Sequence, residues 1–132
     1  MSKILLVGED LMLLETRAAV LRSTGAEILC ADPVSAFAVQ QEHECDVVVL
    51  CHSLREDICA ALAEAVRRHW PKTRILLVIP ERDCGFADAR AVVDAISSPE
   101  PEQLIQKTAE LLRRAELARS ARVAPELSAR AG

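Results

Sequence analysis

Short apolar runs recur along this chain, and each is followed by a segment with the features of a helix. Unbroken apolar runs indicate strands covered on both faces, and their alternation with helices indicates the crossover connections of a parallel sheet. Four clear runs and a weaker fifth lie at 3–7, 26–30, 46–51, 74–79 and 92–96. The sequence therefore predicts an α/β fold in which a strand-helix unit occurs five times.

Capping residues mark the first two helices. Asp10 can cap a helix that runs to Thr24, where Gly25 provides the left-handed conformation common at helix ends. Asp32 is a second capping residue, and it is followed by a proline at the first helical position. We therefore expect a short second helix that begins at Pro33.

Two of the later helices carry apolar stripes at helical spacing. The third helix ends at Pro71, whereas the fourth is poorly marked and falls somewhere within 84–91. The stripe of the third helix consists of Ile58, Ala61, Leu62, Ala65, Val66 and His69. The stripe of the last helix consists of Leu104, Ile105, Thr108, Leu111, Leu112 and Ala115.

The stripe of the last helix dissolves near the end of the chain. From Arg119 the residues are mostly Ala, Arg and Ser, and Pro125 is expected to break any helix. A chain of 132 residues suits one domain and is too short for two. We therefore expect one domain over 1–118 and a tail over 119–132 that is frayed, disordered or an interaction arm.

Composition narrows the classes of function. Because phosphate binding needs a basic face, the net charge of -4 argues against nucleic acid as a partner of the domain body. No apolar run approaches the ~20 residues that cross a bilayer, and the chain enters a strand pattern at once, so we expect a cytoplasmic protein that does not bind membranes. The five cysteines include no C-x-x-C pair, so reduced thiols are expected rather than disulfides or a zinc site.

Three short strings lie where the predicted strands end, and they resemble a known family. They are Lys3-Ile-Leu-Leu-Val-Gly-Glu-Asp10, Cys45-Asp-Val-Val-Val-Leu-Cys51 and Ser98-Pro99. On these residues, and over roughly 3–115, the chain resembles a response-regulator receiver domain, the phosphorylated switch module of bacterial two-component signalling. The resemblance implies a doubly wound, flavodoxin-like sheet of five parallel strands in the order 2-1-3-4-5, with its site at the carboxyl ends of strands 1, 3, 4 and 5.

The resemblance also implies a site whose groups each have a chemical purpose. Two acidic residues after strand 1 and an acceptor aspartate after strand 3 hold Mg²⁺, and the aspartate is phosphorylated. A hydroxyl after strand 4 and a lysine after strand 5 bind the phosphoryl oxygens. In this chain the five positions carry Gly8, Glu9, Cys51, Ile79 and Ser98. Only Glu9 keeps the type of residue that the family uses.

These substitutions predict a receiver-like domain without receiver chemistry. A thiol at position 51 suits Mg²⁺ poorly, and without a lysine at 98 or a hydroxyl at 79 a phosphoryl group lacks its partners. Asp10 is expected to cap the first helix, although Glu9 and Asp10 together could hold a weakly bound cation. We therefore expect no cofactor, no Mg²⁺ site and no phosphorylation by the aspartate route.

Cys51 is also the centre of the alternative hypotheses. Its neighbour His52 suggests a nucleophile and base, but adjacent residues of a strand point to opposite faces. The nearby acidic residues Glu9 and Asp10 would not lower the pKa of the thiol, as a reactive cysteine requires. A structural thiol is favoured, while a redox-sensing thiol, a metal site with His52 and Cys84, and a small-ligand pocket at the former phosphate site stay open.

The leading hypothesis is an atypical receiver that acts in phosphorelay signalling through protein contacts and has no catalytic activity. In the family, the face formed by the fourth helix, fifth strand and fifth helix carries the output and often forms dimers. That face falls within 84–118 of this chain. The resemblance implies a histidine kinase, another regulator or a second copy of the chain as partner. The alternative is a thiol-based redox sensor or a small-ligand-binding domain centred on Cys51.

Overall fold

The strands form one parallel sheet in the predicted order. The structure is a computed structural model that describes residues 2–42, 44–51, 53–80 and 85–131. Its sheet has the order β2-β1-β3-β4-β5, and every neighbouring pair is parallel. The strands are β1 (Lys3–Val7), β2 (Glu27–Ala31), β3 (Val47–Cys51), β4 (Arg74–Val78) and β5 (Ala95–Ser97). This arrangement confirms the predicted fold class.

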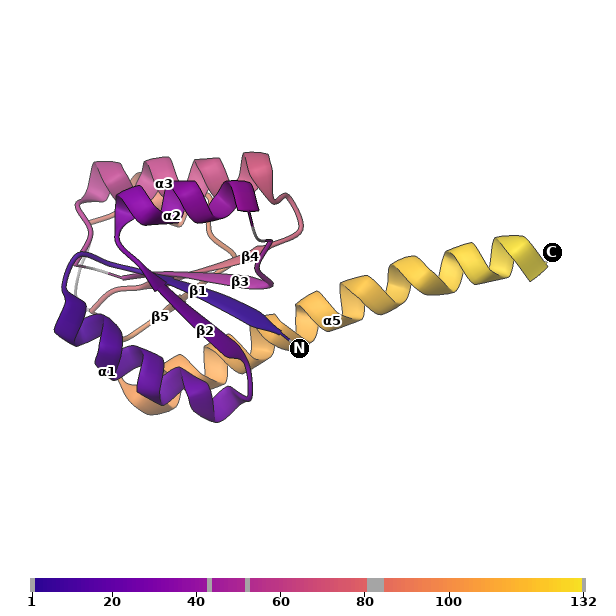
Figure 1. The fold of residues 1–132 in the computed structure, drawn as a ribbon, viewed down its shortest axis with the longest axis horizontal. Helices are drawn as coiled ribbons and strands as arrows, with labels where there is room; N and C mark the ends of the chain where they lie inside the picture. Colours follow the sequence, from indigo (N-terminus) through magenta and orange to yellow (C-terminus); the bar gives the residue numbers. More distant parts are fainter. Residues whose placement is uncertain (1, 43, 52, 81–84, 132) are drawn as a thin grey trace.

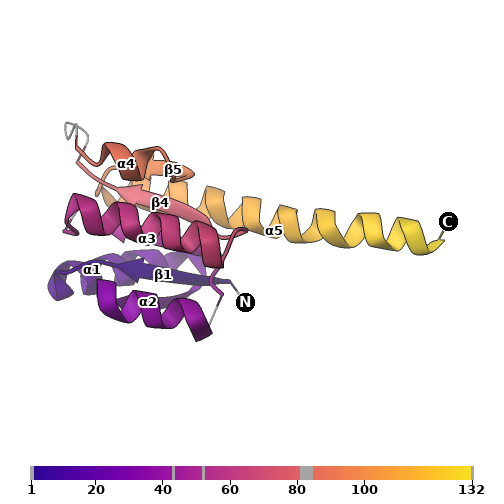
Figure 2. The same ribbon diagram turned by 90° about the horizontal axis from the view of Figure 1, so that it is seen from above.

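Helices cover both faces of the sheet. In Figure 1, α1 and α5 lie on one face while α2 and α3 lie on the other, and Figure 2 shows α4 beside β4 and β5. The helices are α1 (Leu11–Leu21), α2 (Pro33–Glu42), α3 (Glu56–His69), α4 (Ala87–Arg90) and α5 (Pro101–Ala131), and the short 3-10 helix η1 spans Arg22–Thr24. No helix in the described part of the chain is both long and apolar enough to cross a bilayer.

The predicted caps of α1 and α2 are present. The Oδ1 atom of Asp10 accepts a hydrogen bond of 3.1 Å from the backbone N–H of Leu13, and Asp32 does the same for Ser35 at 2.7 Å. Each bond satisfies one of the backbone donors that a helix start leaves free, a contribution of about 1 kcal/mol. Gly25 ends η1 with a φ of 83°, in the left-handed region that glycine adopts without strain.

Two predictions about later elements were wrong in detail. The apolar run at 92–96 is not a strand throughout, because Val92 and Val93 donate backbone hydrogen bonds to Ala89 and belong to the turn after α4. The strand β5 begins only at Ala95. In α3 the sequence stripe was offset, since Ala61 and His69 are exposed. Leu62, Ala65 and Val66 are buried as predicted, and the stripe also includes Cys59 and Ala63.

The prediction that Pro125 breaks the last helix was also wrong. The helix α5 passes through Pro125 and ends at Ala131. A proline in a helix removes one backbone donor and costs about 3 kcal/mol, but the turns on either side can still form. In Figures 1 and 2 this part of α5 projects away from the body of the domain. The domain boundary near residue 118 stays a prediction.

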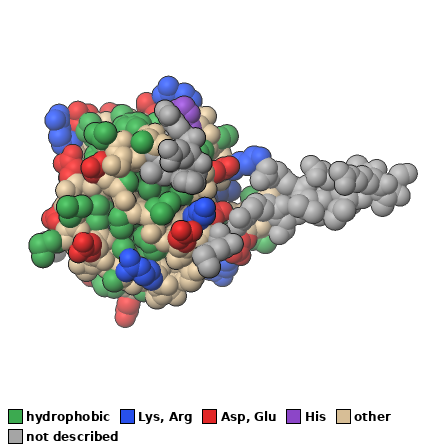
Figure 3. Space-filling view, in the orientation of Figure 1, with side chains coloured by type: hydrophobic (Ala, Val, Ile, Leu, Met, Phe, Trp, Pro, Cys, Tyr) green, Lys and Arg blue, Asp and Glu red, His purple; other side chains and the backbone are tan. Residues whose placement is uncertain are grey.

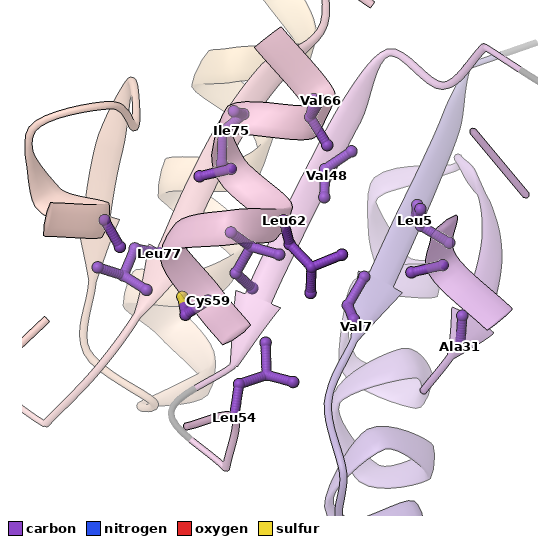
Figure 4. Packing of buried hydrophobic residues seen from close by; sticks show 14 of the residues in the cluster. Leu5, Val7, Ala31, Val48, Leu54, Cys59, Leu62, Val66, Ile75 and Leu77 are labelled. Atoms are coloured by element: carbon purple, nitrogen blue, oxygen red, sulfur yellow. The ribbon is translucent and has the colours of Figure 1, made fainter. Parts of the chain in front are cut away.

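The core consists of two apolar layers, one on each face of the sheet. Alternate residues of each strand point to opposite layers, so Val48 and Leu77 face α2 and α3, while Val49 and Leu76 face α1 and α5. Figure 4 shows the first layer, where Leu62 and Val66 of α3 pack over the strands. Every residue of β3 is buried, and full burial of an aliphatic side chain stabilises the fold by roughly 1.5–3 kcal/mol. The strand that ends at Cys51 is therefore among the most constrained parts of the molecule.

Candidate functional site: the carboxyl edge of the sheet

The five receiver-like positions come together where the strands end, at what we call the carboxyl edge. Cys51 is the last residue of β3 and lies opposite Val78 of β4, which in turn lies opposite Ser97. Ile79 follows β4, and its backbone N–H donates to the carbonyl of Ser97 at 3.0 Å. Gly8 follows β1 and is held by a backbone bond of 3.2 Å to Ala31. Parallel strands bring these residues to one edge although they are far apart in sequence.

The side chain of Cys51 points into the apolar layer under α1 and α5. The residue is only 1% exposed. Burial raises the pKa of the Cys51 thiol, and the guanidinium of Arg17, which acts in the opposite direction, does not offset this. The thiol is therefore protonated at neutral pH and shielded from solvent. Neither property suits a nucleophile.

Three side chains lie close to the backbone of Gly8. A Cβ atom added to Gly8 would lie 2.9 Å from Oγ of Ser53, 3.1 Å from Cδ2 of Leu14 and 3.4 Å from Cβ of Cys51. Gly8 has no positive φ that would itself require glycine, so the constraint is one of space. Any side chain at position 8 would require the ends of the Ser53 and Leu14 side chains to shift. Side chains from α1, from β3 and from the loop after β3 therefore pack closely around Gly8 at the carboxyl edge.

The residues of the carboxyl edge do not fit Mg²⁺. Of its expected oxygen ligands, only Glu9 is present, and its side chain is exposed. The carboxylate of Asp10 is engaged in capping α1. Among the residues that the structure describes, no three His, Cys, Asp or Glu side chains gather into a possible metal site.

Ser53 is a site residue that sequence analysis missed. Its Oγ accepts a hydrogen bond of 3.2 Å from the backbone N–H of Glu9, which links the loop after β1 to the loop after β3. The backbone N–H of Leu54 donates to the carbonyl of Cys51 at 3.1 Å and tightens the second loop. Its position in the sequence could have indicated this role, because Ser53 lies two residues past Cys51 at the same edge.

Arg17 is the second residue that was missed. It lies on the inward stripe of α1 with Leu14, Ala18 and Leu21, and it is only 4% exposed. Its guanidinium lies within hydrogen-bonding reach of the thiol of Cys51. The sequence did contain a signal, since the spacing of Leu14, Arg17, Ala18 and Leu21 is that of a buried helix face. A permanent cation is thus built into this end of the molecule.

The residues Ile79 and Ser98 both make contacts that stabilise the fold. Ile79 is buried in the layer under α2 and α3, where Phe86 is also buried. The Oγ atom of Ser98 accepts a bond of 3.4 Å from the backbone N–H of Glu100, and its own N–H donates to Oε1 of Gln103 at 2.5 Å. Ser98 therefore organises the start of α5. The suggested partners of Cys51 in a thiol–imidazole pair or a metal site, His52 and Cys84, lie outside the described residues.

Comparison with known proteins supports the fold. No protein-family model matches the sequence, and no curated protein matches it either. An uncharacterized protein from Neptuniibacter caesariensis has a TM-score of 0.79 and 17% identity over 89% of this chain and 92% of that one. The chemotaxis response regulator CheY4 of Vibrio cholerae has a TM-score of 0.72 and 22% identity, covering 84% of this chain and 98% of CheY4.

A larger protein contains a similar unit. NtrX from Brucella abortus has a TM-score of 0.77 and 20% identity over 92% of this chain, which corresponds to 28% of NtrX. At such low identities these likenesses show the fold and not the chemistry. The chain therefore has the receiver-like fold of CheY-type response regulators.

Proposed function

We propose that this chain is an atypical receiver domain that acts in two-component phosphorelay signalling through protein contacts and is not itself phosphorylated. One observation carries the proposal: the residue at the end of β3, where a conventional receiver has its acceptor aspartate, is Cys51, whose side chain is buried in the apolar layer under α1 and α5. The chain keeps the scaffold and has replaced the reacting groups with packing. In this role it works in the cytoplasm and catalyses no reaction of its own.

The surface around the carboxyl edge supports a role in protein contacts. Leu11 and Met12 begin α1 and Val34 lies in the first turn of α2, and all three side chains are at least 70% exposed, Met12 and Val34 at 80%. Figure 3 shows hydrophobic side chains at the surface on the side where α1 begins. Exposed apolar side chains that gather on a surface mark interaction sites more often than isolated ones do. A rigid face of this kind can bind a partner without any phosphoryl transfer.

The face formed by α4, β5 and α5 is the second candidate for partner contacts. Ile96 of β5 is 37% exposed there. In the receiver-like fold this face is the expected place for a histidine kinase, another regulator or a second copy to bind. Substitution Ile96→Glu should then weaken capture of that partner from a lysate of the native host. Val34→Glu tests the carboxyl-edge surface in the same way, so the two variants together show which face binds.

A thiol-based redox or ligand-binding function is not favoured. The thiol of Cys51 is buried, and burial raises its pKa. A reactive cysteine needs the opposite, an accessible sulfur whose pKa is lowered.

Treatment with acetyl phosphate and Mg²⁺, followed by intact-mass spectrometry, tests the proposal. We expect no adduct on the unmodified protein, while a conventional receiver treated in parallel gains one phosphate. The variant Cys51→Asp restores the acceptor alone and should also stay unmodified, because the metal ligand at 8 and the lysine at 98 are still missing. A stoichiometric, Mg²⁺-dependent adduct on the unmodified protein would contradict the proposal.

A further inference from the structure

The three most exposed large apolar side chains of the described residues lie at the carboxyl edge. Leu11 and Met12 begin α1, and Val34 lies in the first turn of α2. Phe37 follows Val34 by three residues, which places both on one side of α2, and it is 40% exposed. Single apolar side chains on a surface are ordinary, whereas several at one edge indicate a contact surface.

The strand ends hold the starts of the two helices close to one edge. Val7 is paired with Ala31, and the backbone N–H of Gly8 donates to the carbonyl of Ala31 at 3.2 Å. The helices that follow lie on opposite faces of the sheet (Figure 1). The apolar side chains of α1 and those of α2 therefore stand on either side of the edge, where a partner segment that crosses the edge can contact both groups.

Negative charge lies between the two apolar groups. Glu9 and Asp10 precede α1, Asp32 precedes α2, and all three residues are exposed. Residues 8–12 and 32–36 include no lysine or arginine. The backbone hydrogen bond at the start of α2 lowers the pKa of Asp32, so this carboxylate is ionised at neutral pH. The edge thus combines exposed apolar side chains with uncompensated local negative charge.

Helix dipoles explain the place of the acidic residues and not that of the apolar ones. Carboxylates are favoured near the start of a helix, and Glu56 and Glu102 lie in the first turns of α3 and α5 in the same way. The dipole gives no reason for an exposed methionine or valine beside these carboxylates. The apolar side chains are therefore an independent observation, and the carboxylates determine the charge of what can approach them.

The sign of the charge selects among the possible occupants. An anionic membrane surface or a nucleic acid would be repelled by this edge. A second copy that met the edge through the same surface would bring like charges together. A protein segment whose apolar side chains are flanked by lysine or arginine complements both features of the edge.

We propose that the carboxyl edge binds a basic, amphipathic segment of a partner protein. The apolar side chains of the segment pack on Leu11, Met12 and Val34, and its cationic side chains lie against Glu9 and Asp32. The apolar contacts supply most of the affinity, because exposed ion pairs contribute little, while the charges speed association and make it sensitive to salt. The inference rests on the proposed role in protein contacts and specifies the chemistry of the partner.

Two synthetic peptides test the proposal on the full chain. Each has about 18 residues, or five helical turns, with leucines along one face. One peptide carries lysine on its other face and the second carries glutamate. In NMR titrations of the isotope-labelled protein, the lysine peptide should shift the amide signals at the starts of α1 and α2. It should bind at least about tenfold more tightly than the glutamate peptide, and added salt should reduce that difference.

Matched variants separate the apolar contribution from the charge. Met12→Gln and Val34→Gln keep the charge of the protein and should each weaken binding of the lysine peptide about fivefold or more. Glu9→Lys should weaken it by about tenfold, because an attractive charge becomes repulsive. Leu117→Gln and Glu116→Lys make the same changes on exposed residues at the other end of the sheet and should leave the affinity unchanged. Circular dichroism checks that each variant is folded.

Several outcomes would overturn the proposal. They are the absence of binding to the lysine peptide, equal affinity for the two peptides, and binding that Met12→Gln and Val34→Gln leave unchanged. Binding to vesicles of phosphatidylserine and phosphatidylcholine that these two variants abolish would make a membrane the occupant instead. A phosphate adduct after acetyl phosphate treatment would contradict the proposed function without changing these affinities. Loss of the preference for the lysine peptide would contradict the present inference alone.

Discussion

The two ends of the sheet use their polar residues differently. At the carboxyl edge, Ser53, Leu14 and Cys51 pack closely around Gly8, within 3.4 Å of the position that a Cβ atom there would take. At the opposite end, which we call the amino edge, Asp46 and Asp94 each precede a strand. Each accepts a hydrogen bond from the backbone N–H of a residue at the start of the neighbouring strand, Lys3 at 2.9 Å and Ile75 at 2.7 Å.

The amino edge also holds the most connected ion pair of the described residues. The carboxylate of Asp94 forms ion pairs with Arg67 at 2.6 Å and with Arg74 at 3.5 Å. Arg67 donates in addition to the backbone carbonyls of Val92 and Thr73. The network joins α3 to the start of β4 and to the turn before β5. Ionisable groups thus serve structure at the amino edge, whereas apolar packing dominates around Gly8 and Cys51 at the carboxyl edge.

The largest expected effect tests whether the carboxyl edge is really filled. Gly8→Asp should destabilise the fold by about 4 kcal/mol, because the new side chain overlaps Ser53 and Leu14 and places a carboxylate in a buried position. Urea unfolding measures the loss. Glu9→Asp introduces the same residue one position later, on an exposed site, and should change stability by less than about 0.5 kcal/mol.

A second variant shows whether the overlap is the cause. Ser53→Ala removes the Oγ atom that lies closest to the added side chain, so the double variant Gly8→Asp with Ser53→Ala should regain part of the lost stability. If Gly8→Asp proves as stable as the unmodified protein, the space beside Gly8 is open. The contrast between the two edges would then disappear.

The second effect tests the amino edge. Asp94→Asn should destabilise the fold by about 2–3 kcal/mol, since it removes the charge that Arg67 and Arg74 share in a partly buried setting. The chain contains a matched control in the pair of Arg55 and Asp57, whose side chains are well exposed. Asp57→Asn should cost about 0.5 kcal/mol or less. Equal losses in the two variants, measured by urea unfolding, would show that the network at the amino edge is no more than a surface pair.

The sequence predicted the fold well where a local signal and the tertiary structure agree. The run that ends at Cys51 is buried on both sides, and the caps Asp10 and Asp32 make the expected bonds. The prediction from sequence failed where packing overrides the local signal. Val92 and Val93 have the composition of a strand, but the network around Asp94 begins β5 only after them.

The candidate site was predictable in position and not in detail. The ends of parallel strands must meet at one edge, so Gly8, Cys51 and Ser98 could be placed from their order in the chain. The neighbours that decide the chemistry could not, because they come from side-chain packing. An arginine is normally assigned to the surface, yet Arg17 occupies the buried face of α1.

The smallest expected effect tests whether water reaches the apolar layer beneath α3, close to the carboxyl edge. Burial raises the pKa of Cys59 to about 12, against 9.0 for an ordinary thiol. A group whose pKa is raised in the folded state stabilises the fold fully below the unfolded pKa, and this contribution is lost as the pH rises toward the folded value. The free energy of unfolding should therefore fall between pH 9 and 12 in part because of this one residue.

Replacement of Cys59 by alanine isolates that contribution. Cys59→Ala lowers stability at every pH because it leaves a small cavity. The informative quantity is therefore the slope of the free energy of unfolding against pH, and not its value at any one pH. Between pH 8 and 10 the free energy of unfolding of the variant should fall by about 1 kcal/mol less than that of the unmodified protein. The comparison variant Cys30→Ala removes an exposed thiol whose pKa partial burial raises less than that of Cys59, so it should change the slope less than Cys59→Ala does. Parallel slopes for all three proteins would mean that Cys59 titrates as readily in the folded chain as in the unfolded one, and that water reaches this side of the sheet.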